Sequence, residues 1–139
     1  MTRILGIDYG KARIGLALSD ERRFLASTLP CIQAGKTAEE NAHLIAKESA
    51  KYGPLISIVM GLPLHLSGRE SPLSEEVRQV AQLLEGLLQD IPMILWDERL
   101  STAQVEKTLK EMGVSRKKRS AKVDSQSAAL ILQSFLDVH

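Results

Sequence analysis

A short apolar run that ends in a carboxylate constrains the fold of this chain more than any other feature. Residues Ile4–Ile7 are typical of a central β-strand covered on both faces, and Asp8 follows them directly. Burying a charged group is costly unless something compensates for the charge. We therefore expect a layered α/β fold in which Asp8 has a chemical role, and binding a divalent metal ion is one such role.

Length and composition place the chain among ordinary globular proteins. Its 139 residues are enough for one domain with a substantial core, which we expect to span residues 1–139. Hydrophobic residues make up 44% and charged residues 25%, and the net charge is only +1. A globally polycationic protein is thereby excluded, so any surface that binds nucleic acid must be local.

The chain carries no sign of export or of membrane insertion. Its single cysteine, Cys31, cannot form an internal disulfide, which suits a reducing compartment. No apolar run approaches the roughly 18 residues of a membrane span. The N-terminus lacks the apolar core of a signal peptide. We expect a cytoplasmic protein without membrane contact.

The order of strand and helix signals predicts a mixed sheet. Three strands come first, at Arg3–Asp8, at Arg13–Ser19 and within Phe24–Gln33, and their short links predict an antiparallel meander. The elements expected next are a helix from Thr37 to about Tyr52, a strand at Leu55–Met60, a helix opening at Ser71-Pro72, a strand at Pro92–Trp96, a helix from Ser101 to Gly113 and a last helix from about Val123 to Leu136. Alternating helices and strands favour parallel crossovers, so we predict a five-stranded mixed sheet flanked by helices.

Acidic residues stand at the ends of the predicted core elements. Asp8 ends the first strand and Asp97-Glu98 ends the fifth, so a sheet in which these strands are parallel neighbours brings both ends to one edge. Side chains alternate along a strand, so only one of Asp97 and Glu98 points towards Asp8, and spacing alone does not choose between them.

Asp124 has two compatible interpretations. It could cap the N-terminus of the last helix, because Asp is favoured there. It also stands four residues before Ala128, on the side of the expected core-facing stripe. That stripe consists of Ala128, Ile131, Leu132, Phe135 and Leu136. A helix that packs this stripe on the sheet would direct Asp124 at the sheet.

Three converging carboxylates suit phosphodiester chemistry. Mg²⁺ prefers oxygen ligands, and two such ions roughly 3.5–4 Å apart can bind both the attacking water and the leaving oxygen. The alternative for each acid is a surface salt bridge, for which Arg99 beside Glu98 is a candidate partner.

Basic residues near these acids are candidates for contact with a nucleic-acid backbone. Lys11 and Arg13 closely follow Asp8, and a basic stretch precedes Asp124. That stretch consists of Arg116, Lys117, Lys118, Arg119 and Lys122. Aromatic residues are few, so we do not expect base stacking to contribute much to nucleic-acid binding.

Five motifs in a fixed order resemble the YqgF/RuvX family over nearly the whole chain. They are Gly6-Ile7-Asp8-Tyr9-Gly10, Arg13-Ile14-Gly15, Gly61-Leu62-Pro63, Asp97-Glu98-Arg99-Leu100-Ser101-Thr102 and Val123-Asp124-Ser125 through Ala128-Ala129. The resemblance implies an RNase H-like fold shared with RuvC-type resolvases. It also implies that Asp8, Glu98 and Asp124 are the metal-binding acids, which favours Glu98 over Asp97. Residues 64–68 depart from the family pattern, in which Asn and Asp are more usual.

The resemblance also implies an activity. The family is described as Holliday-junction resolvases and as nucleases that mature the 5′ end of pre-16S ribosomal RNA. We therefore expect a metal-dependent endonuclease with two Mg²⁺ or Mn²⁺ ions, acting on pre-16S rRNA in ribosome biogenesis or, second, on four-way DNA. Ribosomal assembly intermediates are candidate partners, and we expect a monomer or a weak homodimer. Alternatives of another class are an ATP-binding protein of the actin type and a non-catalytic RNA-binding factor.

Overall fold

A computed structural model describes residues 2–100 and 121–139, and within the last segment it describes side chains from residue 126 onwards. The elements are β1 (Arg3–Tyr9), β2 (Arg13–Ser19), β3 (Ala26–Gln33), α1 (Ala38–Ser49), the 3₁₀ turn η1 (Ala50–Tyr52), β4 (Leu55–Leu62), α2 (Pro72–Leu87), β5 (Met93–Asp97), the 3₁₀ turn η2 (Glu98–Leu100) and α4 (Ala121–Val138). The helix expected from Ser101 to Gly113 lies outside the described residues. None of the described helices is long and apolar enough to cross a membrane.

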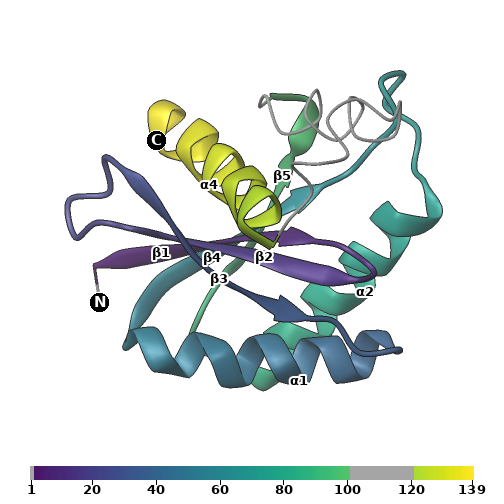
Figure 1. The fold of residues 1–139 in the computed structure, drawn as a ribbon, viewed down its shortest axis with the longest axis horizontal. Helices are drawn as coiled ribbons and strands as arrows, with labels where there is room; N and C mark the ends of the chain where they lie inside the picture. The colour runs from purple at the N-terminus through teal and green to yellow at the C-terminus, as the bar shows by residue number, and fades with distance from the viewer. Residues whose placement is uncertain (1, 101–120) are drawn as a thin grey trace.

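The five strands form one mixed sheet in the order β3-β2-β1-β4-β5. β2 runs antiparallel to β1 and to β3, whereas β4 runs parallel to β1 and to β5. The predicted sheet of an antiparallel meander plus two parallel strands is therefore confirmed. Helices α1 and α2 pack on one face of this sheet and α4 on the other (Figure 1). β1 is the central strand, and the ends of β1, β4 and β5 reach the same edge.

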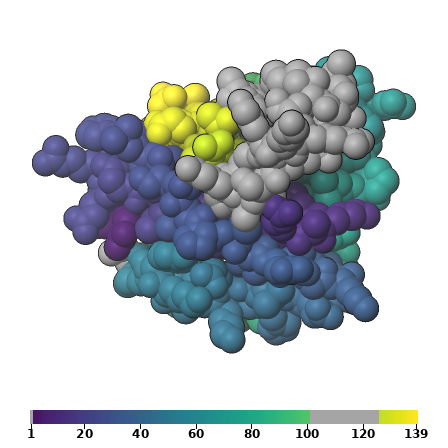
Figure 2. Space-filling model, in the orientation of Figure 1, coloured from purple at the N-terminus to yellow at the C-terminus, as the bar shows by residue number. Residues whose placement is uncertain are grey.

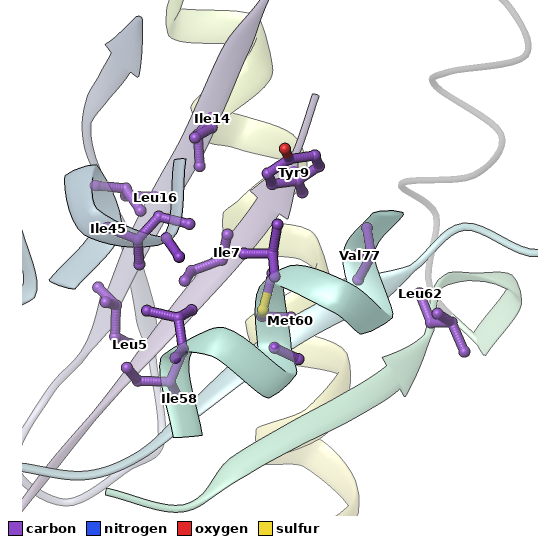
Figure 3. Packing of buried hydrophobic residues seen from close by; sticks show 14 of the residues in the cluster. Leu5, Ile7, Tyr9, Ile14, Leu16, Ile45, Ile58, Met60, Leu62 and Val77 are labelled. Carbon is purple, nitrogen blue, oxygen red and sulfur yellow. The ribbon is translucent and has the colours of Figure 1, made fainter. Parts of the chain in front are cut away.

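Alternating side chains of β1 divide the core into two layers. Leu5, Ile7 and Tyr9 point to the face covered by α1 and α2, where they join one hydrophobic cluster (Figure 3). Ile4 points to the opposite face and packs in the cluster built around α4. Because side chains alternate along a strand, Asp8 shares the α4 face with Ile4.

Helix α4 lies directly on the sheet. A Cβ added at Gly6 would be 2.7 Å from the Cβ of Leu132 and 3.3 Å from the carbonyl oxygen of Ala128, so the helix approaches the strand closely only because this residue is glycine. The stripe predicted to face the core, from Ala128 to Leu136, is buried as expected.

The direction of α4 is fixed at its far end by the β2–β3 hairpin. The Gln133 side-chain oxygen accepts a hydrogen bond from the backbone N–H of Ala26 (2.9 Å), and its amide nitrogen donates to the carbonyl of Phe24 (2.8 Å). Figure 2 shows the yellow end of the helix seated against this blue-violet hairpin. The hairpin lies beside the start of β1, because Leu18 pairs with Leu5. The first turn of α4 therefore lies towards the opposite end of β1.

The sequence predicts the first residues of α1 and α4 to within two positions, but not every hydrogen bond there. Thr37 caps α1 as expected, accepting a hydrogen bond from the backbone N–H of Glu40 (3.1 Å). The spacing of Thr37 and Glu40 also predicts a capping box, in which the Glu40 side chain accepts from the backbone N–H of Thr37. The carboxylate of Glu40 accepts from the backbone N–H of Lys36 instead (3.3 Å). α4 begins at Ala121, before the predicted start at Val123.

A buried hydroxyl ties the end of β1 to both helices on its face. Tyr9 donates a hydrogen bond to the carboxylate of Glu76 on α2 and accepts one from the side-chain amide of Asn41 on α1 (2.7 Å). The Asn41 oxygen in turn accepts from the backbone N–H of Gly35 (2.7 Å). Burial, followed by the hydrogen bond to Glu76, raises the pKa of Tyr9 well above its ordinary value.

Replacing Tyr9 with Phe is expected to destabilise the protein by about 1–3 kcal/mol, because the Asn41 amide and the Glu76 carboxylate lose their buried partner. The free energy of unfolding should also fall in the wild type above pH about 10, where the unfolded tyrosine ionises but the native one resists ionisation. Urea denaturation across pH measures both effects.

The matched control is Tyr52→Phe, which removes a more exposed hydroxyl with a 3.4 Å contact to Glu48. It should cost less than Tyr9→Phe. Equal losses of stability in the two variants would contradict the role given to Tyr9.

Candidate active site

Asp8 lies near the carboxyl end of the central strand and is buried, with 7% of its surface exposed. Strand alternation places it on the α4 face, two residues beyond Gly6, against which α4 packs. A carboxylate is thus held under the start of a helix, at the edge where β1, β4 and β5 end.

Glu98 lies on the same face. β5 ends at Asp97, and Glu98 opens the 3₁₀ turn η2 with none of its surface exposed. A Cβ added at Gly61 of β4 would be 2.8 Å from the Cγ of Glu98 and 2.6 Å from the Cδ1 of Ile131 on α4. The side chain of Glu98 therefore occupies the space that glycine leaves between β4 and α4.

The register between β1 and β4 brings Glu98 next to Asp8. Ile7 pairs with Met60 in the parallel ladder, so the following residues, Asp8 and Gly61, are neighbours on adjacent strands. Such strands lie about 4.8 Å apart. Since the Glu98 side chain covers Gly61, two of the three predicted acids meet on one face of the sheet.

Asp97 has a different role. The strand residues before it alternate between the two faces, with Ile94 and Trp96 in the α4 cluster and Met93 and Leu95 in the opposite one. The Asp97 carboxylate forms an ion pair with Arg99 (2.6 Å) and accepts a hydrogen bond from the backbone N–H of the same residue (2.9 Å).

The hydrogen bond from the Arg99 side chain lowers the pKa of Asp97, and that of Arg99 is raised in return. Arg99, considered from the sequence as a salt-bridge partner for Glu98, forms its ion pair with Asp97 instead. It also donates to the carbonyl of Leu66 (3.2 Å), which ties the loop after β4 to η2. This contact was not predicted, because no spacing in the sequence relates Leu66 to Arg99.

Asp124 lies in the first turn of α4 and not at its cap, because the helix begins at Ala121. Its Cα is one turn ahead of Ala128, which packs over Gly6, and the helix runs from there towards the hairpin. The backbone thus carries Asp124 to the end of β1 where Asp8 lies. Among the side chains that the structure describes, no group of three potential metal ligands forms, and the side chain of Asp124 is outside that set. Its assignment as a third ligand stays a prediction.

The basic residues predicted to contact nucleic acid fall into two groups, and the structure describes the side chains of the first group only. Lys11, in the turn between β1 and β2, and Arg13, the first residue of β2, are both exposed and close to Asp8 in the chain. A Cβ at Gly10 would be 2.6 Å from the carbonyl oxygen of Arg13, so glycine permits this tight turn. The predicted contacts from Arg116, Lys117, Lys118 and Arg119 lie outside the described residues, as does the side chain of Lys122.

Comparison with known protein families shows which family this chain belongs to. A family model described as "RuvX: Holliday junction resolvase" matches residues 2–138. The chain belongs to the RuvX family. A protein of Protochlamydia amoebophila named "Putative pre-16S rRNA nuclease" is 46% identical over 141 residues. The alignment covers 98% of this chain and 93% of that protein. A protein of Chlamydia caviae with the same name is 42% identical, with coverage of 96% and 82%.

The fold of this RuvX protein is shared with RuvC. The structure of T. thermophilus RuvC in complex with a Holliday junction substrate superposes with a TM-score of 0.58 over 99% of this chain and 95% of that chain. Sequence identity is 14%, so the likeness concerns the fold alone. The expected RNase H-like architecture is confirmed.

Gly61→Ala is expected to displace Glu98, because the new methyl group would overlap both the Glu98 stem and Ile131. Overpacking of this kind costs about 1–3 kcal/mol. A lower melting temperature and a loss of metal-dependent stabilisation, both measured by calorimetry, are the expected results.

Gly86→Ala is the matched control, since a Cβ at this α2 position meets nothing within 4 Å. It should leave stability unchanged or raise it by up to about 1 kcal/mol through helix propensity. Unchanged metal-dependent stabilisation in Gly61→Ala would contradict the placement of Glu98.

Proposed function

We propose that this RuvX protein is a metal-dependent endonuclease that hydrolyses phosphodiester bonds in structured RNA, with the precursor of 16S rRNA as its substrate. The observation that carries the proposal is the burial of Asp8 and Glu98 side by side on the face of the sheet that α4 covers. The names of the curated relatives, which share 42–46% of their residues with this chain, support the choice of substrate.

The donor set suits hard divalent cations. Carboxylate oxygens are the ligands that Mg²⁺ prefers, and two acids in a site of low dielectric are costly unless a cation compensates for their charge. Asp8, Glu98 and Asp124 would hold Mg²⁺ or Mn²⁺. When bound, a pair of such ions supplies an activated water and stabilises charge on the leaving oxygen of the phosphodiester.

The remaining roles fall to residues of this chain that approach the backbone of the substrate. Lys11 on the turn between β1 and β2 and Arg13 at the start of β2 are exposed, where they can contact phosphates beside the scissile bond. The basic stretch of residues 116–122 precedes Asp124 in the chain and would extend this contact. Cleavage would leave 5′-phosphate and 3′-hydroxyl ends, and residues 1–139 would form one nuclease domain.

A second candidate function is resolution of four-way DNA junctions, and the description of the matching family model favours it. A resolvase that cuts two strands symmetrically is expected to act as a two-fold dimer. A monomer that cleaves RNA and ignores the junction fits the first candidate. A non-catalytic RNA-binding factor would bind either substrate without metal-dependent cleavage.

Asp8→Asn is expected to abolish cleavage, by a factor of at least about 10³, because an amide cannot replace the charge of a metal-binding carboxylate. The measurement is a time course with Mg²⁺ or Mn²⁺ on precursor 16S rRNA and on a four-way DNA junction, side by side. The melting temperature and RNA affinity of the variant should match those of the wild type.

Asp90→Asn is the matched control, since Asp90 is exposed in the loop before β5. It should cleave as the wild type does. Cleavage by Asp8→Asn at the wild-type rate would refute the assignment of the site, and binding without cleavage by the wild type would favour the non-catalytic factor.

Glu98→Gln and Asp97→Asn separate the two neighbouring acids. Glu98→Gln is expected to abolish cleavage, as Asp8→Asn does. Asp97→Asn loses the ion pair with Arg99 but no ligand, so cleavage should stay within roughly tenfold of wild type when Mg²⁺ is saturating. If the two variants exchanged these phenotypes, Asp97 would be the ligand and Glu98 a structural residue.

A further inference from the structure

The turn that carries Glu98 has little internal support. η2 is a single 3₁₀ turn of three residues at the end of an edge strand. Such turns have weaker hydrogen bonds than an α-helix and are stable only in short pieces. The position of the Glu98 carboxylate therefore depends on contacts that the flanking residues make with other elements.

One hydroxyl group contacts both flanks of this turn. The Oγ atom of Ser134 on α4 accepts a hydrogen bond from the indole Nε1 of Trp96 (3.0 Å) and donates one to the carbonyl oxygen of Leu100 (3.0 Å). Trp96 stands two residues before Glu98 and Leu100 two residues after it. Ser134 thus brackets the acid from both sides.

The indole ring is fixed by its own packing. Trp96 meets Phe135 edge to face, with ring centroids 5.4 Å apart, and His139 similarly at 5.6 Å. These contacts hold the indole N–H towards Ser134 without involving Glu98. The geometry of the hydroxyl bridge is therefore set by α4 and its neighbours.

Helix α4 also carries Asp124, ten residues before Ser134 and hence about 15 Å away along the helix axis. A rigid helix that binds both flanks of the Glu98 turn fixes that turn relative to the first turn of the same helix. On the outer side, the contact of Arg99 with Leu66 ties the turn only to a surface loop.

We propose that Ser134 is a positioning residue that fixes the Glu98 carboxylate relative to the other metal ligands. The inference rests on the proposed metal site, and it adds a residue that touches neither metal nor substrate. Ser134 is only partly buried, so water can take over its hydrogen bonds when the hydroxyl is removed. Its loss should therefore loosen the turn without unfolding the protein.

The test is a calorimetric titration of the full chain with Mn²⁺ alone, in the absence of nucleic acid. Removing a residue that orients a metal ligand commonly lowers metal affinity 10–100-fold, so Ser134→Ala should raise the Kd for Mn²⁺ by roughly tenfold or more. Ser134→Thr retains the hydroxyl and should restore affinity. Trp96→Phe removes the donor while keeping an aromatic ring, and its effect should not add to that of Ser134→Ala.

The matched control is Ser49→Ala, which removes another serine hydroxyl that donates to a carbonyl, that of Ala46 (2.8 Å), on α1 away from the site. It should leave the Kd for Mn²⁺ unchanged. A purely structural role for Ser134 would lower the melting temperature equally with and without Mn²⁺ and leave its Kd at the wild-type value, which would overturn the proposal.

The titration also separates this proposal from the nuclease assignment. If the Kd values follow the expected pattern but the wild type cleaves neither RNA nor junction DNA, the positioning role stands and the nuclease assignment fails. If the wild type cleaves and Ser134→Ala binds Mn²⁺ as tightly, the nuclease assignment stands and the positioning role fails. A wild type that binds no Mn²⁺ overturns the positioning role.

Discussion

The close contact between α4 and the sheet determines how the rest of the molecule is arranged around the acids. Two glycines on neighbouring strands, Gly6 and Gly61, leave a flat area on which the helix rests through Leu132 and Ile131. Side chains at those positions would hold the helix away from the strands and admit water. The two carboxylates are buried because the backbone beneath the helix has no side chains of its own there.

The sheet topology explains why the acids can meet although they are distant in sequence. β1 and β5 are both parallel neighbours of β4, so their carboxyl ends lie at one edge. Parallel strands end together in this way at the binding sites of many α/β proteins. The meander and the two parallel strands were predictable from the sequence, because short turns produce the first and helical crossovers the second. The strand order was not: from the sequence we considered β1 and β5 as neighbours, whereas β4 lies between them.

Strand alternation could predict that Asp97 and Glu98 point in different directions, but not which one joins Asp8. The answer depends on the turn that follows β5 and on the space above Gly61, a contact between segments far apart in the chain. The same limit applies to the bonds of Tyr9 with Glu76 and of Ser134 with Trp96. Each is a side-chain contact across elements whose relative placement no local pattern specifies. Periodicity did predict the buried stripe of α4, because that pattern is local.

Asp8 and Glu98 lie on parts of the fold that differ in the free energy needed for local unfolding. Asp8 belongs to the central strand, whose hydrogen bonds on both sides break only when the whole sheet comes apart. Glu98 belongs to a one-turn extension of an edge strand, which can detach by fraying while the rest stays folded. Native-state fluctuations that separate the two acids are therefore expected to begin at the β5 side, while β1 and its neighbours stay folded.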